Sequence, residues 1–170
     1  MYDLISWIWY IFYYVFCGII LVLSIMLILL IINQRKMIYV SYFPEGSRKH
    51  VVLPSSFGCR PKITLNHSLN EYDGYEIITL TTEDSVTIQA YWIPFQSIPS
   101  ALNKSMSDLP IFLFFHANAG NMGHRIPIAL ELAKALKCHV YMLSYRGYGH
   151  SEGNPSEAGL KLDAQVNNIY

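Results

Sequence analysis

The sequence predicts an α/β fold preceded by an N-terminal transmembrane helix. Three features lead to this prediction: a long uncharged apolar stretch, two β-branched segments around a polar turn, and two apolar runs flanking an amphipathic helical pattern. The 170 residues include 12 basic and 12 acidic side chains, so the formal net charge is zero. This balance gives no electrostatic reason to expect nucleic acid as a partner.

The apolar stretch runs from Leu4 to Ile32, and 26 of its 29 residues are apolar. A bilayer core about 30 Å thick requires about 20 helical residues, so the stretch is long enough to span it. A cleaved signal peptide would begin with basic residues and have a shorter apolar core, whereas this segment begins with Asp3. We therefore expect residues 1–34 to form a retained single-pass anchor that contacts the lipid bilayer through Leu4–Ile32.

The charges beside this anchor favour a cytosolic location for the domain that follows. Arg35 and Lys36 come directly after the apolar stretch and no basic residue precedes it, which the positive-inside rule reads as a cytosolic flank. Two glycosylation sequons, which begin at Asn66 and Asn103, favour the opposite side. Short sequons also arise by chance, so the cytosolic orientation is the expectation.

Proline and glycine punctuate residues 35–70, which predicts a connector between the anchor and a domain formed by residues 71–170. The domain begins with Glu76–Thr82, which is rich in β-branched residues, and Val86–Pro94 follows after a three-residue polar turn. This spacing predicts an antiparallel β-hairpin.

A parallel pair of strands is expected next. Ile111–Phe115 is a continuous apolar run, typical of a strand covered on both faces, and Val140–Ser144 is a second such run. Between them, Arg125–Lys137 has a helical pattern with one apolar stripe, so the three segments predict a βαβ unit. The residues of the stripe are Ile126, Ala129, Leu130 and Ala133.

A second helix is predicted near the end of the sequence. Asn154, Pro155 and Glu157 have the order of an N-cap, a first helical residue and an acidic third residue. The helix is expected to present one apolar face, made by Leu162, Val166 and Ile169.

The candidate site lies in the loops that follow the two parallel strands, where α/β sheets place their ligands. The first loop begins with His116, Ala117 and Asn118. Its small residues allow backbone N–H groups to approach a ligand, and the N-terminus of the following helix favours a developing anion. This pattern suits an oxyanion hole, but a tight structural turn would show the same residues.

The second loop, residues 145–153, contains a literal G-x-S-x-G match centred on Ser151. A nucleophile elbow places its serine directly between a strand and a helix, whereas the expected strand ends near Tyr145, six residues earlier. The loop glycines also resemble a loosened dinucleotide fingerprint, but the strand and acidic residue that should follow are missing. The six histidines show no metal-ligand spacing, so neither a cofactor nor a metal is expected.

Residues 114–133 (FFHANAGNMGHRIPIALELA) and 145–165 (YRGYGHSEGNPSEAGLKLDAQ) resemble the membrane-anchored α/β-hydrolases of the α/β-hydrolase domain-containing protein 13 group, also called bud-emergence-like. The likeness covers roughly residues 70–170. It implies a truncated α/β-hydrolase fold, in which a β-hairpin is followed by strand, helix, strand and helix. It also implies a serine hydrolase that acts on small acyl substrates such as esters, thioesters or amides.

The resemblance assigns roles to the loop residues. Asn118 falls where the family has one oxyanion N–H, His116 and Ala117 shape the turn, and the loop that begins at Arg146 forms a wall near the site. The family usually has glycine where this chain has Ala117, so the turn would be strained if that position required a positive φ. Ser144 stands where the family commonly has an acid.

The family's nucleophile, acid and histidine follow the matching region, and none of them occurs in these 170 residues. We therefore expect the N-terminal part of a membrane-anchored serine hydrolase that is inactive by itself. One alternative is a membrane-tethered interaction or regulatory module that associates with itself or with a paralogue through an exposed sheet edge. A further alternative is a minimal hydrolase that uses Ser151 with His150 or His116.

Overall fold

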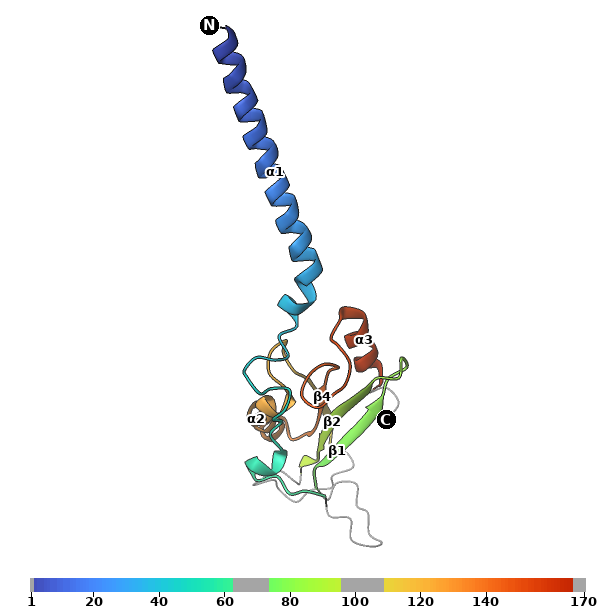
Figure 1. Ribbon diagram of the computed structural model, residues 1–170. Helices are drawn as coiled ribbons and strands as arrows, with labels where there is room; N and C mark the ends of the chain where they lie inside the picture. The colour runs from blue at the N-terminus through green and yellow to red at the C-terminus, as the bar shows by residue number, and fades with distance from the viewer. Residues whose placement is uncertain (1, 63–73, 96–108, 167–170) are drawn as a thin grey trace. The chain divides into compact units, whose positions relative to one another are not determined.

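The computed structural model describes residues 2–62, 74–95 and 109–166, and the chain divides into two compact units, Met1–Ile38 and Tyr39–Tyr170. The first unit is a single helix, α1 (Tyr2–Ile38) (Figure 1). By length and composition α1 can cross a membrane, and none of its apolar window is buried within the protein. The predicted long apolar helix is confirmed.

The second unit contains a mixed sheet in the strand order β1-β2-β4-β3. β1 (Glu76–Thr81) and β2 (Thr87–Ile93) form an antiparallel hairpin, as their β-branched sequences predicted. β4 (His139–Ser144) pairs antiparallel with β2 and parallel with β3 (Ile111–Phe115). Both the hairpin and the parallel pair are therefore confirmed.

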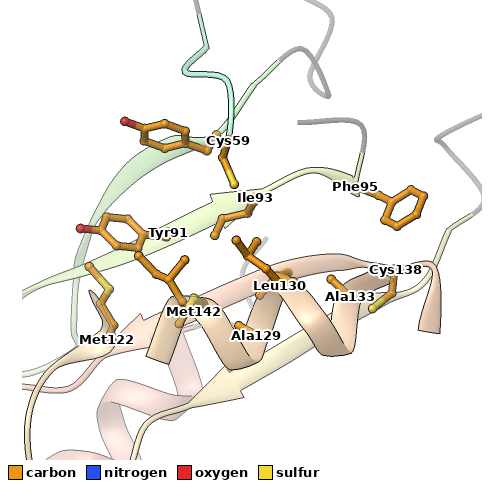
Figure 2. Close-up of a cluster of buried hydrophobic side chains, with 13 residues drawn as sticks. Cys59, Tyr91, Ile93, Phe95, Met122, Ala129, Leu130, Ala133, Cys138 and Met142 are labelled. Atoms are coloured by element: carbon orange, nitrogen blue, oxygen red, sulfur yellow. The ribbon is translucent and has the colours of Figure 1, made fainter. Parts of the chain in front are cut away.

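Different helices cover the two faces of this sheet, because successive side chains of a strand point to opposite faces. On one face α2 (Ile126–Leu136) packs against Tyr91 and Ile93 of β2 and Met142 of β4 (Figure 2). The predicted stripe of α2 is buried as expected, with Ile126, Ala129, Leu130 and Ala133 in this cluster. On the other face Val166, directly after α3 (Glu157–Gln165), packs in a second cluster with Trp92.

Full burial was the expectation for β3 and β4, and it holds only for β4. Every residue of β4 is buried, whereas Ile111, Leu113 and Phe115 of β3 are 57%, 48% and 43% exposed. β3 is the edge strand of the described sheet, and only its alternate residues, Phe112 and Phe114, pack against the cluster under α2. The prediction that β3 is covered on both faces was wrong for the described residues.

The start of α3 also differs from the sequence prediction. Ser156 is the N-cap, and its Oγ accepts a hydrogen bond from the N–H of Gly159 at 3.2 Å, so the cap lies two residues after Asn154. Within α3 the buried residues are Gly159 and Asp163, and of the predicted apolar face Val166, directly after the helix, is buried as expected. Leu162 is half-buried, and Ile169 lies outside the described residues.

Residues 39–62, within the stretch expected to be a connector, pack on the sheet domain. They include a short 3₁₀ helix, η1 (Pro54–Phe57), whose Pro54 is buried, and Cys59 lies in the cluster under α2. The N–H of Tyr75 donates to the carbonyl of Arg60 at 2.8 Å, which joins the end of this segment to the strand region. Residues 35–38 of the expected connector continue α1, and residues 63–70, together with both sequons, lie outside the described residues.

Candidate active site

Two loops lie at the same edge of the sheet, because they follow the carboxyl ends of the parallel strands β3 and β4. We call residues 116–121 the β3 loop and residues 145–153 the β4 loop. The β3 loop leads into the short 3₁₀ helix η3 (Met122–Arg125) and then directly into α2. The positive end of a helix dipole therefore follows the loop that carries the predicted site residues.

His116 joins the two loops and is 6% exposed. Its Nδ1 lies 2.8 Å from the carbonyl oxygen of Ala117, and its Nε2 accepts a hydrogen bond from the N–H of Tyr145 at 3.3 Å. These partners require the tautomer with the proton on Nδ1. Burial lowers the pKa of His116 to about 4, with the Ala117 carbonyl opposing the shift, so the ring is neutral and both nitrogens are used.

Ala117 and Asn118 are exposed at the surface of the domain. The carbonyl oxygen of Asn118 accepts hydrogen bonds from the Tyr148 hydroxyl at 2.9 Å and from the N–H of Val40 at 3.0 Å. The strain expected at Ala117 does not arise, because Ala117 is not among the described residues with a positive φ. The left-handed position of this turn is occupied by Gly120, with φ of 83°.

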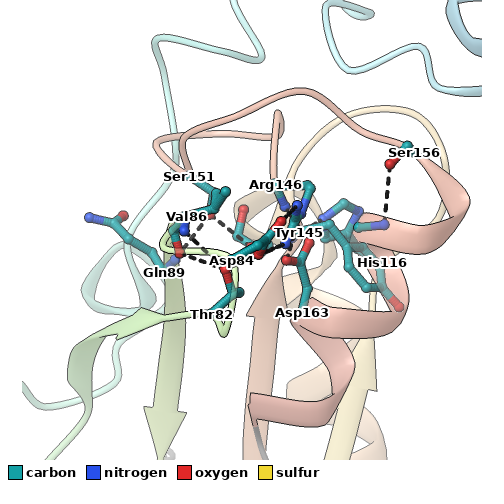
Figure 3. Close-up of polar contacts among 12 residues, drawn as sticks. Thr82, Asp84, Val86, Gln89, His116, Tyr145, Arg146, Ser151, Ser156 and Asp163 are labelled. Atoms are coloured by element: carbon teal, nitrogen blue, oxygen red, sulfur yellow. Dashed lines mark hydrogen bonds and ion pairs between the residues drawn. The ribbon is translucent and has the colours of Figure 1, made fainter.

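The β4 loop is held by Arg146, which is 5% exposed (Figure 3). Its N–H and Nε donate to the two carboxylate oxygens of Asp163, each at 2.8 Å. Its Nη1 and Nη2 donate to the two oxygens of Asp84, at 2.6 and 2.8 Å. Arg146 therefore connects β4 to α3 on one side and to the turn of the β1–β2 hairpin on the other.

The charges of this cluster are structural. Hydrogen bonds from Arg146, and then from Thr82, hold the pKa of Asp84 well below its usual range, and the same pairing raises the pKa of Arg146. Burial raises the pKa of Asp163, and the bonds from Arg146 oppose this shift. Sequence reasoning missed both carboxylates; the available signal was Asp163, an acid within the apolar positions of a predicted helix.

Ser151, a residue of the β4 loop, is buried, and its hydroxyl both donates and accepts a hydrogen bond. Its hydroxyl donates to the carbonyl of Ser144 at 2.7 Å and accepts from the N–H of Gln89 at 3.0 Å (Figure 3). His116 is engaged by Tyr145, and the exposed His150 lies with Nε2 3.2 Å from the carbonyl of Lys49. Among the described residues, neither histidine that the alternative of a minimal hydrolase names is hydrogen-bonded to the hydroxyl of Ser151.

Ser144, which stands in place of the family's acid, stabilises the same loop, since its hydroxyl donates to the carbonyl of Tyr148 at 3.1 Å. Among the described residues, no group of three or more His, Cys, Asp or Glu side chains could hold a metal ion. The three cysteines are free thiols; Cys59 and Cys138 are buried and Cys17 lies on α1.

The sequence is 44% identical to the protein bem46 of Schizosaccharomyces pombe over 78% of the chain. It is 36% identical to the alpha/beta hydrolase domain-containing protein WAV2 of Arabidopsis thaliana over 81% of the chain. The chain belongs to the α/β-hydrolase superfamily. It spans 38% of the length of each of these two relatives. No protein-family model matches the sequence.

Two further matches concern the location and the fold of this α/β-hydrolase chain. An uncharacterized membrane protein of Saccharomyces cerevisiae is 35% identical over 77% of the chain and 37% of its own length, which together with α1 supports a membrane location. The crystal structure of an alpha-beta hydrolase from Vibrio vulnificus aligns with a TM-score of 0.50 at 18% identity. The alignment covers 81% of this chain and 41% of that one. This likeness confirms the predicted α/β-hydrolase fold.

Proposed function

We propose that this chain supplies the membrane anchor and the oxyanion side of the active site of a serine hydrolase that cleaves esters, thioesters or amides. The observation that carries the proposal is the contrast at the carboxyl edge of the sheet. Ala117 and Asn118 are exposed in the loop that leads into η3, whereas Arg146 and Ser151 are buried. Membership in the α/β-hydrolase superfamily supports the reaction class.

The chemistry assigned to the β3 loop is stabilisation of a developing negative charge. Attack on an acyl carbonyl turns its oxygen into an oxyanion, and backbone N–H groups aimed at that position lower the barrier. In the proposal the N–H of Asn118 is one donor, the residue after the nucleophile supplies the other, and the helix that begins at η3 adds a favourable dipole.

We propose that the nucleophile, its acid and its histidine come from outside the described residues, and that residues 1–170 alone do not hydrolyse esters. Two observations support this. Ser151 donates to a backbone carbonyl rather than to a described base. β3 is the edge strand of the described sheet, with Ile111, Leu113 and Phe115 exposed, which suits pairing with a further strand. We also propose that the domain faces the cytosol, because Arg35 and Lys36 lie in the last turn of α1.

The test is the labelling rate of the full-length gene product with a fluorophosphonate probe. Asn118→Pro removes the proposed oxyanion N–H, whereas the matched variant Asn118→Ala keeps it. We expect labelling to slow by about 100-fold in the proline variant and to stay near the wild-type rate in the alanine variant. Thermal unfolding of both variants shows whether the domain is intact. Equal labelling of the two intact variants would exclude the oxyanion role, and labelling of residues 1–170 alone would exclude the proposed inactivity.

A second candidate function is a membrane-tethered interaction module. The observation in its favour is again β3, which is the edge strand of the described sheet and exposes apolar side chains. An edge of this kind pairs readily with a strand of another chain, such as a second copy or a paralogous hydrolase. Co-purification of residues 1–170 with a full-length paralogue, abolished by Leu113→Lys, is the expected result; a monomer that binds no hydrolase would contradict it.

A further inference from the structure

The segment directly after α1 is hydrogen-bonded to the candidate oxyanion loop. We call residues 39–52 the strap. The N–H of Val40 donates to the carbonyl of Asn118 at 3.0 Å, and the N–H of Gly120 donates to the carbonyl of Phe43 at 2.7 Å. The backbones of Val40 and Ala119 also form an isolated parallel β-bridge, so the strap lies beside the β3 loop at this point.

Asn121 makes the second connection between the strap and the β3 loop. It is 0% exposed, and its Nδ2 donates to the carbonyls of Ser47 and His50 at 2.8 and 3.0 Å. Its Oδ1 accepts from the N–H of His124 at 3.3 Å, which caps η3. The buried side-chain amide of Asn121 therefore donates both of its N–H groups to the strap and accepts a hydrogen bond from the start of the helix with its oxygen.

The strap also contacts the β4 loop. Nη1 of Arg48 donates to the carbonyl of Ser151 at 3.1 Å, and the carbonyl of Lys49 lies 3.2 Å from Nε2 of His150. Farther along, the strap approaches η3 so closely that a Cβ on Gly123 would lie 2.6 Å from the backbone nitrogen of Val52. The strap thus touches both loops at the carboxyl edge of the sheet.

The composition of the β3 loop explains why it requires such support. Residues 117–120 are Ala, Asn, Ala and Gly, whose small side chains leave room for a substrate but make few contacts that fix a backbone. Oxyanion stabilisation needs donors preorganised to within a few tenths of an ångström. The bonds that fix this loop therefore come from other parts of the chain, namely the strap, Tyr148 and Arg125.

We infer that the strap is a positioning element of the active site and that Asn121 is its principal positioning residue, an inference that rests on the function proposed above. Val40 follows the last residue of α1 by two positions, so the peptide that sets the oxyanion loop is also the peptide that leaves the membrane anchor. The strap makes the geometry of the oxyanion loop dependent on the juxtamembrane backbone. A hydrolase of this design loses catalytic rate, rather than substrate affinity, when the strap is loosened.

The test uses two independent changes in the full-length gene product. Asn121→Asp keeps the shape and the cap acceptor of the side chain but removes both donors to the strap. Val40→Pro removes the N–H that binds Asn118. Its matched control is Ser41→Pro, at the second position of a turn closed by the N–H of Phe43 and the carbonyl of Val40, where proline is favoured.

Two readouts are compared, hydrogen exchange of residues 116–123 and the kinetics of fluorophosphonate labelling. We expect exchange of the Gly120 amide to become about fivefold faster in Asn121→Asp and Val40→Pro, as for the loss of one ordinary hydrogen bond. The maximal labelling rate should fall about tenfold or more, with the probe concentration at half-maximal rate little changed. Ser41→Pro should match the wild type in both readouts.

Each result has a separate meaning. Faster exchange with an unchanged labelling rate would overturn the positioning role while leaving the proposed hydrolase function intact. A weakened affinity at an unchanged maximal rate would overturn it as well. A wild-type protein that is never labelled would refute the hydrolase function, and the positioning role with it. If Asn121→Asp fails to fold, the comparison of Val40→Pro with Ser41→Pro decides.

Discussion

The two loops at the carboxyl edge of the sheet are stabilised in opposite ways. In the β4 loop, Arg146, Tyr148 and Ser151 are buried, and their own side chains make the bonds that hold the loop. In the β3 loop, the side chains of the two ends, His116 and Asn121, are buried and hydrogen-bonded, but Ala117 and Asn118 between them are exposed. Residues 117–120 are held by bonds from the strap and from the side chains of Tyr148 and Arg125.

This difference separates scaffold from candidate chemistry. A loop that presents its backbone to a substrate cannot fill the same space with its own side chains, so it is fixed from outside. A loop that only supports its neighbour can bury its own side chains and use them to bond the surrounding elements. The chain therefore places its charged and hydroxyl groups in the β4 loop, where they stabilise, and leaves small residues in the β3 loop.

The largest effect is expected when the ion pairs of Arg146 with Asp163 and Asp84 are broken. Arg146→Met leaves the carboxylate of Asp163, which is 0% exposed, without its guanidinium. Breaking a buried ion pair on one side lowers the free energy of unfolding by about 3–5 kcal/mol. Urea unfolding monitored by tryptophan fluorescence measures this loss. Lys161→Met, which breaks an exposed pair with Glu157, is the control and should cost less than about 0.5 kcal/mol; equal losses would show that the β4 loop is not the scaffold.

The second prediction concerns His116, whose side chain connects the two loops. Because burial lowers the pKa of His116 to about 4, the unfolded chain binds more protons than the folded one between about pH 6.5 and 4. The stability contributed by the neutral ring is present above pH 6.5 and is lost as the pH falls towards 4, by up to about 3 kcal/mol. Unfolding free energies measured across this range should fall more steeply for the wild type than for His116→Gln.

The control for this pH effect is Ser56→Ala, which changes an exposed residue that does not ionise in this range. This variant should keep the pH dependence of the wild type. If the unfolding free energy of His116→Gln still fell steeply with falling pH, another titrating group would be responsible and His116 would not explain the effect.

The third prediction tests whether Ser151 belongs to the scaffold. Ser151→Ala leaves the N–H of Gln89 and the carbonyl of Ser144 without their shared partner, so the free energy of unfolding should fall by about 1–3 kcal/mol. The fluorophosphonate labelling rate of the full-length gene product should not change. Ser56→Ala, at an exposed serine, should stay within about 0.5 kcal/mol of the wild type. Loss of labelling in Ser151→Ala would reverse the roles assigned to the two loops.

The sequence predicted the elements well where a single period dominated. The hairpin, the stripe of α2 and the run of β4 all combine a regular apolar pattern with local turn signals, and each appears at nearly the expected residues. The burial of β3 was predicted wrongly because an apolar run has the same sequence pattern in a central strand and in an edge strand. At the edge of the described sheet, alternate residues of β3 are exposed. Burial on both faces depends on neighbours that the run itself does not encode.

The candidate site was predicted less completely than the fold. The loop that begins with His116 was proposed because its small residues, such as Ala117, follow a strand. The family resemblance assigned roles to His116, Ala117 and Asn118, and these roles stay predictions. The contacts of the strap and of Arg146 were missed, because they join residues separated by 17 to 103 positions and leave no local pattern. Residues 35–70 were expected to form a connector because they are rich in turn-forming proline and glycine, but these residues mark turns in packed segments as well as in linkers.

The smallest expected effects come from two substitutions, alanine to glycine in the β3 loop and glycine to alanine in the β4 loop. Ala117 has no positive φ, so Ala117→Gly relieves no strain and only adds freedom to the unfolded chain, which should lower the free energy of unfolding by about 0.4–1 kcal/mol. Gly153 in the β4 loop has φ of 73°, and Gly153→Ala should lower it by about 1–2 kcal/mol because a Cβ is strained there. Urea unfolding of both variants measures the two losses. A gain of stability in Ala117→Gly would mean that the β3 loop is strained after all. The strap would then be holding the loop in an unfavourable conformation rather than in a relaxed one.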